Sequence, residues 1–318
     1  MRHAGGFLFL IVSVLGTVSE ERTALAGDTA TMREMVNSGT VGLVGGSIKG
    51  TYARFAWDLS AVLDDGYDMR VLPINGKGSV QNIEDLLFLR GVDIAIVQSD
   101  VLDFYKRAEL YPDIEQRIHY ITKLYNEEIH LLARNEFTTV DDLIGRRVNF
   151  GPKGGGTFMT AGIVFDDLGI DVEVASFDYE VALEKLRQGE IDALLHVAGK
   201  PVTLMSEVTR GEGLHLLSLP ADRIKASYVP TEFTAETYPE LVPPGQPVPT
   251  VAVGAVMAAY NWATDHPRRT KVNRFMSSFS ENFDRLLEAP YHPKWQEVDL
   301  QAEVPGWQRM TAAEAATQ

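Results

Sequence analysis

Three glycine-rich segments of this chain have the composition of turns that hold an anion. They are residues 45–50, 76–78 and 151–156, and each follows an apolar run and precedes a helical pattern. Glycine lets the backbone turn tightly and lets a ligand approach the peptide plane. The first N–H groups of a helix lack an intrahelical partner and carry partial positive charge, so they suit a carboxylate or a phosphate.

Each of the three segments also carries one lysine: Lys49, Lys77 and Lys153. On a chain with a strong acidic excess, three lysines in three equivalent turns predict positive charge focused on one small anion. The alternative for each segment is an ordinary tight turn with a solvated lysine.

Polar side chains at the same predicted strand ends are candidates for setting specificity. They are Ser47, Thr51 and Tyr52 after the first strand, Ser79 and Asn82 after the second, Gln98 and Ser99 after the third, and Thr157 in the second set. Their alternative role is helix capping, for which Ser79 and Thr157 are suited. Capping and ligand contact are compatible.

The elements that position these residues alternate between strand and helix. Apolar runs at 41–44, 69–74 and 93–97 predict strands, with helical patterns opening at Thr51 and Ser79. A second set follows, with strands at 148–150, 172–175, 191–197 and 215–219 and helices opening at Thr157 and Tyr179. This alternation is typical of an α/β fold with a mostly parallel sheet, in which ligands bind at the carboxyl ends of the strands.

Two apolar strands, at 129–133 and 250–258, bracket the second set, and 318 residues exceed what one hydrophobic core usually serves. We therefore expect a periplasmic-binding-protein-like fold. Two lobes, each with a central mostly parallel sheet flanked by helices, would be joined by these two crossing hinge strands. Residues 27–128 and 254–318 would form lobe 1, and residues 129–253 an inserted lobe 2.

The N-terminus has the pattern of a cleaved signal peptide over residues 1–26. Arg2 precedes an apolar run at 7–18, and small residues at 24 and 26 offer a cleavage site. A retained membrane anchor is the alternative, because residues 20–22 are charged. The chain has no cysteine, which excludes a lipid-modified one, and no later run is long enough to span a bilayer. We expect a periplasmic protein whose mature chain does not insert into the membrane.

Composition and motifs argue against several other classes. The formal net charge of −15 disfavours binding to nucleic acid or to an anionic lipid surface. Nucleotide-binding glycine loops and a Gly-x-Ser-x-Gly nucleophile motif are absent, and the seven histidines lack metal-ligand spacing. His196 at a strand end is better explained as a packed residue than as a catalytic base. We expect no catalysis, no metal and no cofactor.

Several of these segments resemble the TAXI family, the solute receptors of a branch of tripartite ATP-independent periplasmic (TRAP) transporters. The similarity is collinear from about residue 41 to residue 258. It is carried by Gly50-Thr51-Tyr52, Gly78-Ser79-Val80-Gln81-Asn82, Asp93-Ile94-Ala95-Ile96-Val97-Gln98-Ser99-Asp100, Leu124-Tyr125-Asn126-Glu127, Gly151-Pro152, Gly154-Gly155-Gly156-Thr157, Gly189-Glu190-Ile191-Asp192-Ala193 and Val197-Ala198-Gly199.

The resemblance implies a receptor that captures a small anionic solute, of the amino acid or di- or tricarboxylate type, between its lobes and delivers it to a TRAP membrane permease. Carried over by position, the ligand contacts would come from Ser47, Thr51, Tyr52, Ser79, Gln98, Ser99, Tyr125, Thr157 and Gly199. The chain departs from the family pattern at Lys49, which replaces a glycine, and at Lys77 and Lys153, where uncharged residues are common. These departures favour a multiply charged acid.

Two other functions fit the same architecture. A periplasmic ligand sensor would present its bound form to a membrane signalling kinase rather than to a permease. An enzyme on a similar two-lobed scaffold is the third hypothesis, against which the missing nucleophile and metal motifs count.

Overall fold

The fold is built on one mixed sheet whose two middle strands pass through both halves of the molecule. The computed structural model describes residues 29, 31–32, 36–48, 50–66, 68–225 and 227–311, so the predicted signal peptide and Lys49 lie outside the described residues. Within them, ten strands form a sheet with the path β2-β1-β3-β10-β4-β7-β5-β6; β8 pairs with β4, and β9 with β10.

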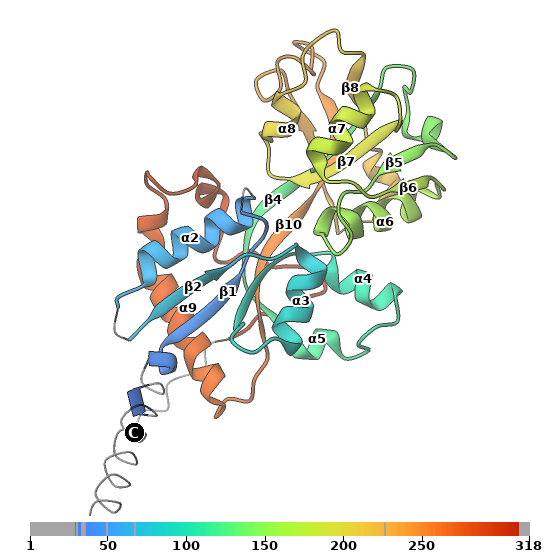
Figure 1. The fold of residues 1–318 in the computed structure, drawn as a ribbon. Helices are drawn as coiled ribbons and strands as arrows, with labels where there is room; N and C mark the ends of the chain where they lie inside the picture. The colour runs from blue at the N-terminus through green and yellow to red at the C-terminus, as the bar shows by residue number, and fades with distance from the viewer. Residues whose placement is uncertain are drawn as a thin grey trace, which may run out of the picture.

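We call the part built on β1 to β3 the first half. The strands β1 (Thr40–Val44), β2 (Arg70–Ile74) and β3 (Ile94–Gln98) are parallel. The helices of this half are α2 (Thr51–Leu63), α3 (Ser79–Phe88), α4 (Val101–Arg107), α5 (Ile114–Arg117) and α9 (Pro267–Leu286), followed by the 3₁₀ helix η3 (Pro293–Glu297). Figure 1 shows α2 and α9 on one side of the three parallel strands and α3 on the other.

The second half repeats this design. Its strands β5 (Arg147–Asn149) and β7 (Ala193–Ala198) are parallel, as are β5 and β6 (Glu173–Ala175). The remaining elements are η1 (Val140–Leu143), α6 (Gly156–Leu168), α7 (Tyr179–Arg187), α8 (Thr203–Ser206), β8 (Leu214–Leu216), η2 (Ala221–Arg223) and β9 (Val229–Phe233). The predicted fold class is confirmed: each half has a mostly parallel sheet flanked by helices.

Two long antiparallel strands, β4 (Ile118–Arg134) and β10 (Val248–Tyr260), link the halves. They run side by side from one half to the other (Figure 1). In the first half β10 pairs with β3, and in the second β4 pairs with β7. The chain passes between the halves in these two strands, and the predicted lobe boundaries at 128/129 and 253/254 fall inside them.

The C-terminal part of the described chain packs against the first half. Trp295 of η3 is fully buried and stacks on Phe55 of α2, with ring centroids 4.0 Å apart. Its indole Nε1 donates a 3.0 Å hydrogen bond to Asp58, a buried carboxylate of the same helix that also accepts from the backbone N of His292. Phe275 and Phe279 of α9 belong to the same apolar cluster, so residues more than 200 apart in sequence share one core.

Candidate functional site

The helices α2, α3 and α6 each have a glycine as N-cap residue, and none of the three has a side-chain cap. Their N-cap residues are Gly50, Gly78 and Gly155, and no side-chain hydrogen bond caps any of them. The proposed capping role of Ser79 and Thr157 is therefore wrong, because both lie one or two residues inside the helix. Since the first amides of a helix have no intrahelical acceptor, three helix ends can offer N–H groups to a ligand.

These three turns meet one another. The backbone N of Gly76 donates to the carbonyl of Gly46 at 3.2 Å, which joins the first turn to the second. A Cβ added to Gly78 would lie 2.8 Å from the backbone N of Gly156, across the boundary between the halves. The backbone N of Gln81 also donates to the carbonyl of Gly154 at 3.4 Å. The second turn thus contacts the first within its own half and the third in the other half.

A buried polar cluster lies where the second and third turns touch. Ser79 Oγ donates to Gln98 Oε1 at 3.2 Å and accepts from the Gln98 backbone N at 2.9 Å. A Cβ on Gly156 would lie only 1.9 Å from Gln98 Oε1, so glycine is required for this close approach. Thr157 Oγ1 accepts from the backbone N of Val197 at 3.1 Å. Gly156 of the third turn therefore lies against Ser79 and Gln98 across the halves, whereas the Thr157 hydrogen bond stays within the second half.

A second cluster lies between α2 and the crossing strand β4. Tyr52 OH donates a 2.5 Å hydrogen bond to Glu127 Oε2, and both residues are buried. Tyr125 is also buried, and a Cβ on Gly199 would lie 3.2 Å from its ring, so Tyr125 and Gly199 are neighbours. The ammonium of Lys294 lies 5.7 Å from the centroid of the same ring. The sequence did not point to Glu127 or Lys294 as site residues.

Glu127 is the most perturbed carboxyl of this region. Burial raises its pKa to about 8 against the opposing effect of the Tyr52 hydrogen bond, and the nearby charges of Asp100 and Glu128 raise it further. Lys294 acts in the lowering direction. At neutral pH this carboxyl is therefore mostly protonated and acts as a hydrogen-bonding group rather than as a charge.

Two of the three predicted lysines can be placed in this arrangement, and neither is buried. Lys77 and Lys153 are exposed, and neither has an ion pair among the residues that the structure describes. Lys153 lines an open hollow of about 620 Å³ together with Ser176, Phe177 and Asp178. The cations that act on Glu127 and Glu128 are instead Lys294, whose side chain is 10% exposed, and Lys200, whose Nζ is 3.7 Å from Glu128 Oε1.

The remaining predicted positions are spread around these two clusters. Thr51 is half-buried at the start of α2, and Ser47 is exposed in the first turn. Ser99 is half-buried: its backbone N donates to the carbonyl of Gly254 at 2.7 Å, and its own carbonyl accepts from Trp307 Nε1 at 2.7 Å. These backbone contacts tie Ser99 to β10 and to the C-terminal segment.

The described residues of the site supply hydrogen-bonding groups. Across the described residues there is no cluster of three or more histidine or acidic side chains able to hold a metal ion. His196 stacks on Tyr179 with ring centroids 4.0 Å apart, and burial lowers its pKa to about 4. It is therefore neutral at pH 7 and placed as a packed residue. Over the same parts of the chain, none of the helices combines the length and apolarity that crossing a bilayer requires.

Two α/β halves that are linked by two long strands and meet at glycine turns give the chain a periplasmic-binding-protein-like fold. The model of the NMT1-like family matches residues 43–303, and the chain belongs to this family. The match covers both halves and both crossing strands. The TAXI family that the motifs predicted is a narrower assignment than the NMT1-like family, and it stays a prediction.

Several solved structures are similar to the chain. The periplasmic binding protein BugD is 14% identical with a TM-score of 0.49, over 82% of this chain and 88% of that chain. The arginine-bound form of truncated ArgBP from T. maritima is 12% identical with a TM-score of 0.46, over 78% and 99%. A TctC solute binding protein from Polaromonas is 15% identical with a TM-score of 0.44, over 77% and 88%.

Proposed function

We propose that this protein is a periplasmic receptor that binds a small anionic solute between its two halves and delivers it to a TRAP-type membrane permease. The observation that carries the proposal is the contact between the uncapped turn at Ser79 and the uncapped turn at Thr157. Glycine N-caps at both turns leave helix amides for a ligand, and the turns belong to different halves.

The proposed ligand contacts fall into two kinds. Backbone N–H groups of α2, α3 and α6, with the hydroxyls of Ser79 and Thr157, would receive the anionic group, because helix N-termini favour negative charge. Gln98, Tyr52 and Tyr125 would hydrogen-bond the rest of the solute, with Ser47, Thr51, Ser99 and Gly199 at its margins. Lys77 and Lys153, which are exposed, would add positive charge at the mouth of the site rather than inside it, and Lys49 would contribute a third positive charge.

The proposed mechanism is closure of the halves around the solute. A ligand that touches both halves binds the closed arrangement better than the open one and shifts the population toward it. The hinge would be the two strands β4 and β10. They connect one lobe, formed by residues 27–128 and 254–318, to the other lobe, formed by residues 129–253. The permease then distinguishes the loaded form from the empty form by the relative position of the halves.

The proposed export to the periplasm and the proposed permease partner rest on features of the sequence. Residues 1–26 would direct secretion and be removed, and the absence of cysteine leaves no lipid attachment, so the mature protein would act in the periplasm. The motif resemblance to the TAXI family supports a TRAP permease as the partner. Binding, without a chemical step, is sufficient for this function.

A thermal-shift screen of the purified protein lacking residues 1–26 tests the proposal. A ligand that binds only the folded state raises the melting temperature by mass action. The panel should hold mono-, di- and tricarboxylates, amino acids, inorganic phosphate and neutral sugars. We expect carboxylates to raise the melting temperature, and Lys49→Ala, Lys77→Ala and Lys153→Ala each to weaken the effect more at low salt.

The screen separates two failures. Stabilisation by carboxylates that is unchanged in all three lysine variants would remove the lysines from the site and leave the receptor intact. Stabilisation by neutral sugars alone, or by none of the panel, would contradict the proposed anionic solute.

A further inference from the structure

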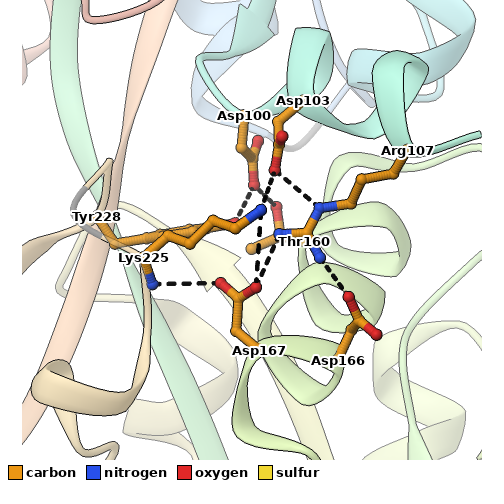
Figure 2. Close-up of polar contacts among 8 residues, drawn as sticks. All are labelled: Asp100, Asp103, Arg107, Thr160, Asp166, Asp167, Lys225 and Tyr228. Atoms are coloured by element: carbon orange, nitrogen blue, oxygen red, sulfur yellow. Dashed lines mark hydrogen bonds and ion pairs between the residues drawn. The ribbon is translucent and has the colours of Figure 1, made fainter.

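We propose that Arg107, Asp167 and Asp100 are the centre of a latch that holds the two halves closed before any solute binds. The latch deepens the proposed function and rests on it, because a latch has a role only where the halves separate. It comprises eight side chains, drawn in Figure 2: Asp100, Asp103, Arg107, Thr160, Asp166, Asp167, Lys225 and Tyr228.

The charged arm of the latch joins α4 to α6. The guanidinium of Arg107, on α4 of the first half, contacts Asp103 Oδ2 of its own helix at 2.9 Å and Asp167 Oδ1 of α6 at 2.7 Å. It also pairs with Asp166 of α6. Asp167 is the buried member, with its side chain 6% exposed. One cation therefore bridges carboxylates from both halves.

Lys225, which follows η2 in the second half, closes the charged arm from the other side. Its Nζ lies 3.5 Å from Asp103 Oδ2 and 4.0 Å from Asp167 Oδ1, and its backbone N donates to Asp167 Oδ2 at 3.2 Å. Figure 2 shows Asp103, Asp167 and the two cations facing one another. Arg107 of the first half is thus paired with Asp166 and Asp167 of the second half, and Lys225 of the second half is paired with Asp103 of the first.

The buried arm joins Asp100 to two hydroxyls of the second half. Asp100 Oδ2 accepts 2.7 Å hydrogen bonds from Thr160 Oγ1 and from Tyr228 OH, and all three residues are buried. Thr160 Oγ1 also lies 3.5 Å from Gln98 Oε1 in the candidate site. Thr160 thus links the latch to Gln98 of the site, so release of the latch would also loosen Gln98.

The chemistry of the contacts suits a reversible closure. Partly exposed ion pairs are individually weak and are screened by salt, so a network of them can break and reform. The buried arm adds direction, because Thr160 and Tyr228 donate to Asp100 Oδ2 only when the halves are closed. A solute whose binding requires the closed form would gain apparent affinity in proportion to the closed fraction.

Distance measurement between spin labels tests the latch without any solute. The chain has no cysteine, so cysteines introduced at Leu110 and Ile144, which are 47% and 60% exposed in the first and second halves, can be labelled selectively. Double electron–electron resonance then reports how the halves are distributed between short and long separations. For the labelled protein without further changes we expect a dominant short distance.

Arg107→Ala should raise the long-distance fraction by on the order of three- to tenfold, and high salt should do the same to the unchanged latch. Tyr228→Phe tests the buried arm and should act in the same direction. The double variant Arg107→Asp with Asp167→Arg should recover only part of the short-distance fraction, because it restores opposite charges at these two positions but brings like charges near Asp103 and Lys225. The matched control is Arg117→Ala, which breaks a 2.7 Å pair with Asp113 inside the first half and should leave the distances unchanged.

Identical distance distributions in Arg107→Ala, Tyr228→Phe and the unmodified latch would overturn the proposal, as would a dominant long distance when the latch is intact. Either result leaves the solute screen unaffected. Conversely, the latch variants could shift the distances as expected while no carboxylate stabilises the protein. That result would contradict the proposed function and leave the latch in place.

Discussion

Tyr52 OH donates a 2.5 Å hydrogen bond to Glu127 Oε2, and this contact joins α2 of the first half to β4, a strand that crosses into the second. Both groups are buried, so the bond forms in surroundings of low polarity, where it is stronger than in water. It places a proton-bearing carboxyl beside the predicted ligand contacts Tyr52 and Tyr125.

Stability should fall as pH rises through the pKa of Glu127. The folded pKa is about 8 and the ordinary value is 4.5, so between these values the folded protein holds a proton that the unfolded chain has lost. The contribution is fully present below pH 4.5 and is lost as pH approaches 8, with a slope of up to about 1.4 kcal/mol per pH unit. Denaturant titrations from pH 6.5 to 8 should show this slope.

Glu127→Gln should flatten that part of the stability curve, because glutamine keeps a hydrogen-bonding group of similar size without a titrating proton. Glu281→Gln, on the exposed side of α9, is the matched control and should leave the slope unchanged. An equal slope in Glu127→Gln and the unmodified protein would contradict the placement of this carboxyl.

On the acid side, His130 should limit stability. Its Nδ1 faces only carbonyl oxygens, those of Glu128 at 3.0 Å and His196 at 3.2 Å, so Nδ1 carries the proton. Nε2 then accepts a 2.8 Å hydrogen bond from Tyr238 OH. A second proton on the ring, at Nε2, would break this hydrogen bond.

Burial lowers the pKa of His130 to about 3 from 6.5. Because the folded state resists protonation, stability present above pH 6.5 should be lost as pH falls toward 3. His130→Gln should reduce the overall free energy of unfolding at pH 7 and make the curve between pH 6.5 and 4 shallower. A curve with the original steepness would show that other groups control acid unfolding.

Gly156→Ala should act as a wedge between the halves. Its Cβ would lie 1.9 Å from Gln98 Oε1 and 2.8 Å from Ser79 Oγ, and both of those residues belong to the first half. We expect a loss of affinity on the order of tenfold for any solute found in the screen, because a smaller fraction of the protein can close. Isothermal titration calorimetry measures it.

The control for this substitution lies on the same helix. A Cβ on Gly162 would meet no atom within 4 Å, so Gly162→Ala should leave the affinity unchanged and stabilise α6 by about 0.5–1 kcal/mol through the higher helix propensity of alanine. Equal affinities for the two alanine variants would argue against the interhalf contact at Gly156.

Asp58→Ala should weaken the first half without touching the candidate site. It would leave the indole of Trp295 and the backbone N of His292 without their buried acceptor. The expected loss in free energy of unfolding is on the order of 3 kcal/mol, measured by denaturant titration. Asp265→Ala, at an exposed position, is the control. A loss as small as that of the control would contradict the packing of η3 on α2.

The repeated strand–turn–helix units were predictable because their residues carry the signal locally. The strand at 94–98 is an unbroken apolar run ending in glutamine, and α2 shows its buried face at Phe55 and Leu59. The hinge was harder. The sequence placed the first crossing strand at 129–133, whereas β4 begins at Ile118, because polar residues such as Lys123 and Asn126 interrupt the alternation.

The strand β9 was missed for a similar reason: Pro230 and Glu232 give Val229–Phe233 the composition of a loop. Its pairing with β10 supplies the order that its own residues do not encode. A proline fits there at the margin of a sheet, where one N–H is not needed.

Among the candidate contacts, the turns at Ser79 and Thr157 were found from glycine spacing alone. Glu127 and Asp100 were not, because a single acidic residue in or after an apolar strand gives no sign of its partners. Tyr52 lies 75 positions from Glu127 and Tyr228 lies 128 positions from Asp100. Only the fold brings these pairs together.

The path of the sheet has a consequence for how the protein is made. Strand β10 lies between β3 and β4, yet it is synthesised more than a hundred residues after β4 ends at Arg134. Until Val248–Tyr260 leaves the ribosome, β3 and the first part of β4 each present an open edge, and such edges invite pairing with other chains. The nascent protein therefore carries these open strand edges until β10 has been made, and a chaperone that covers strand edges would aid its folding.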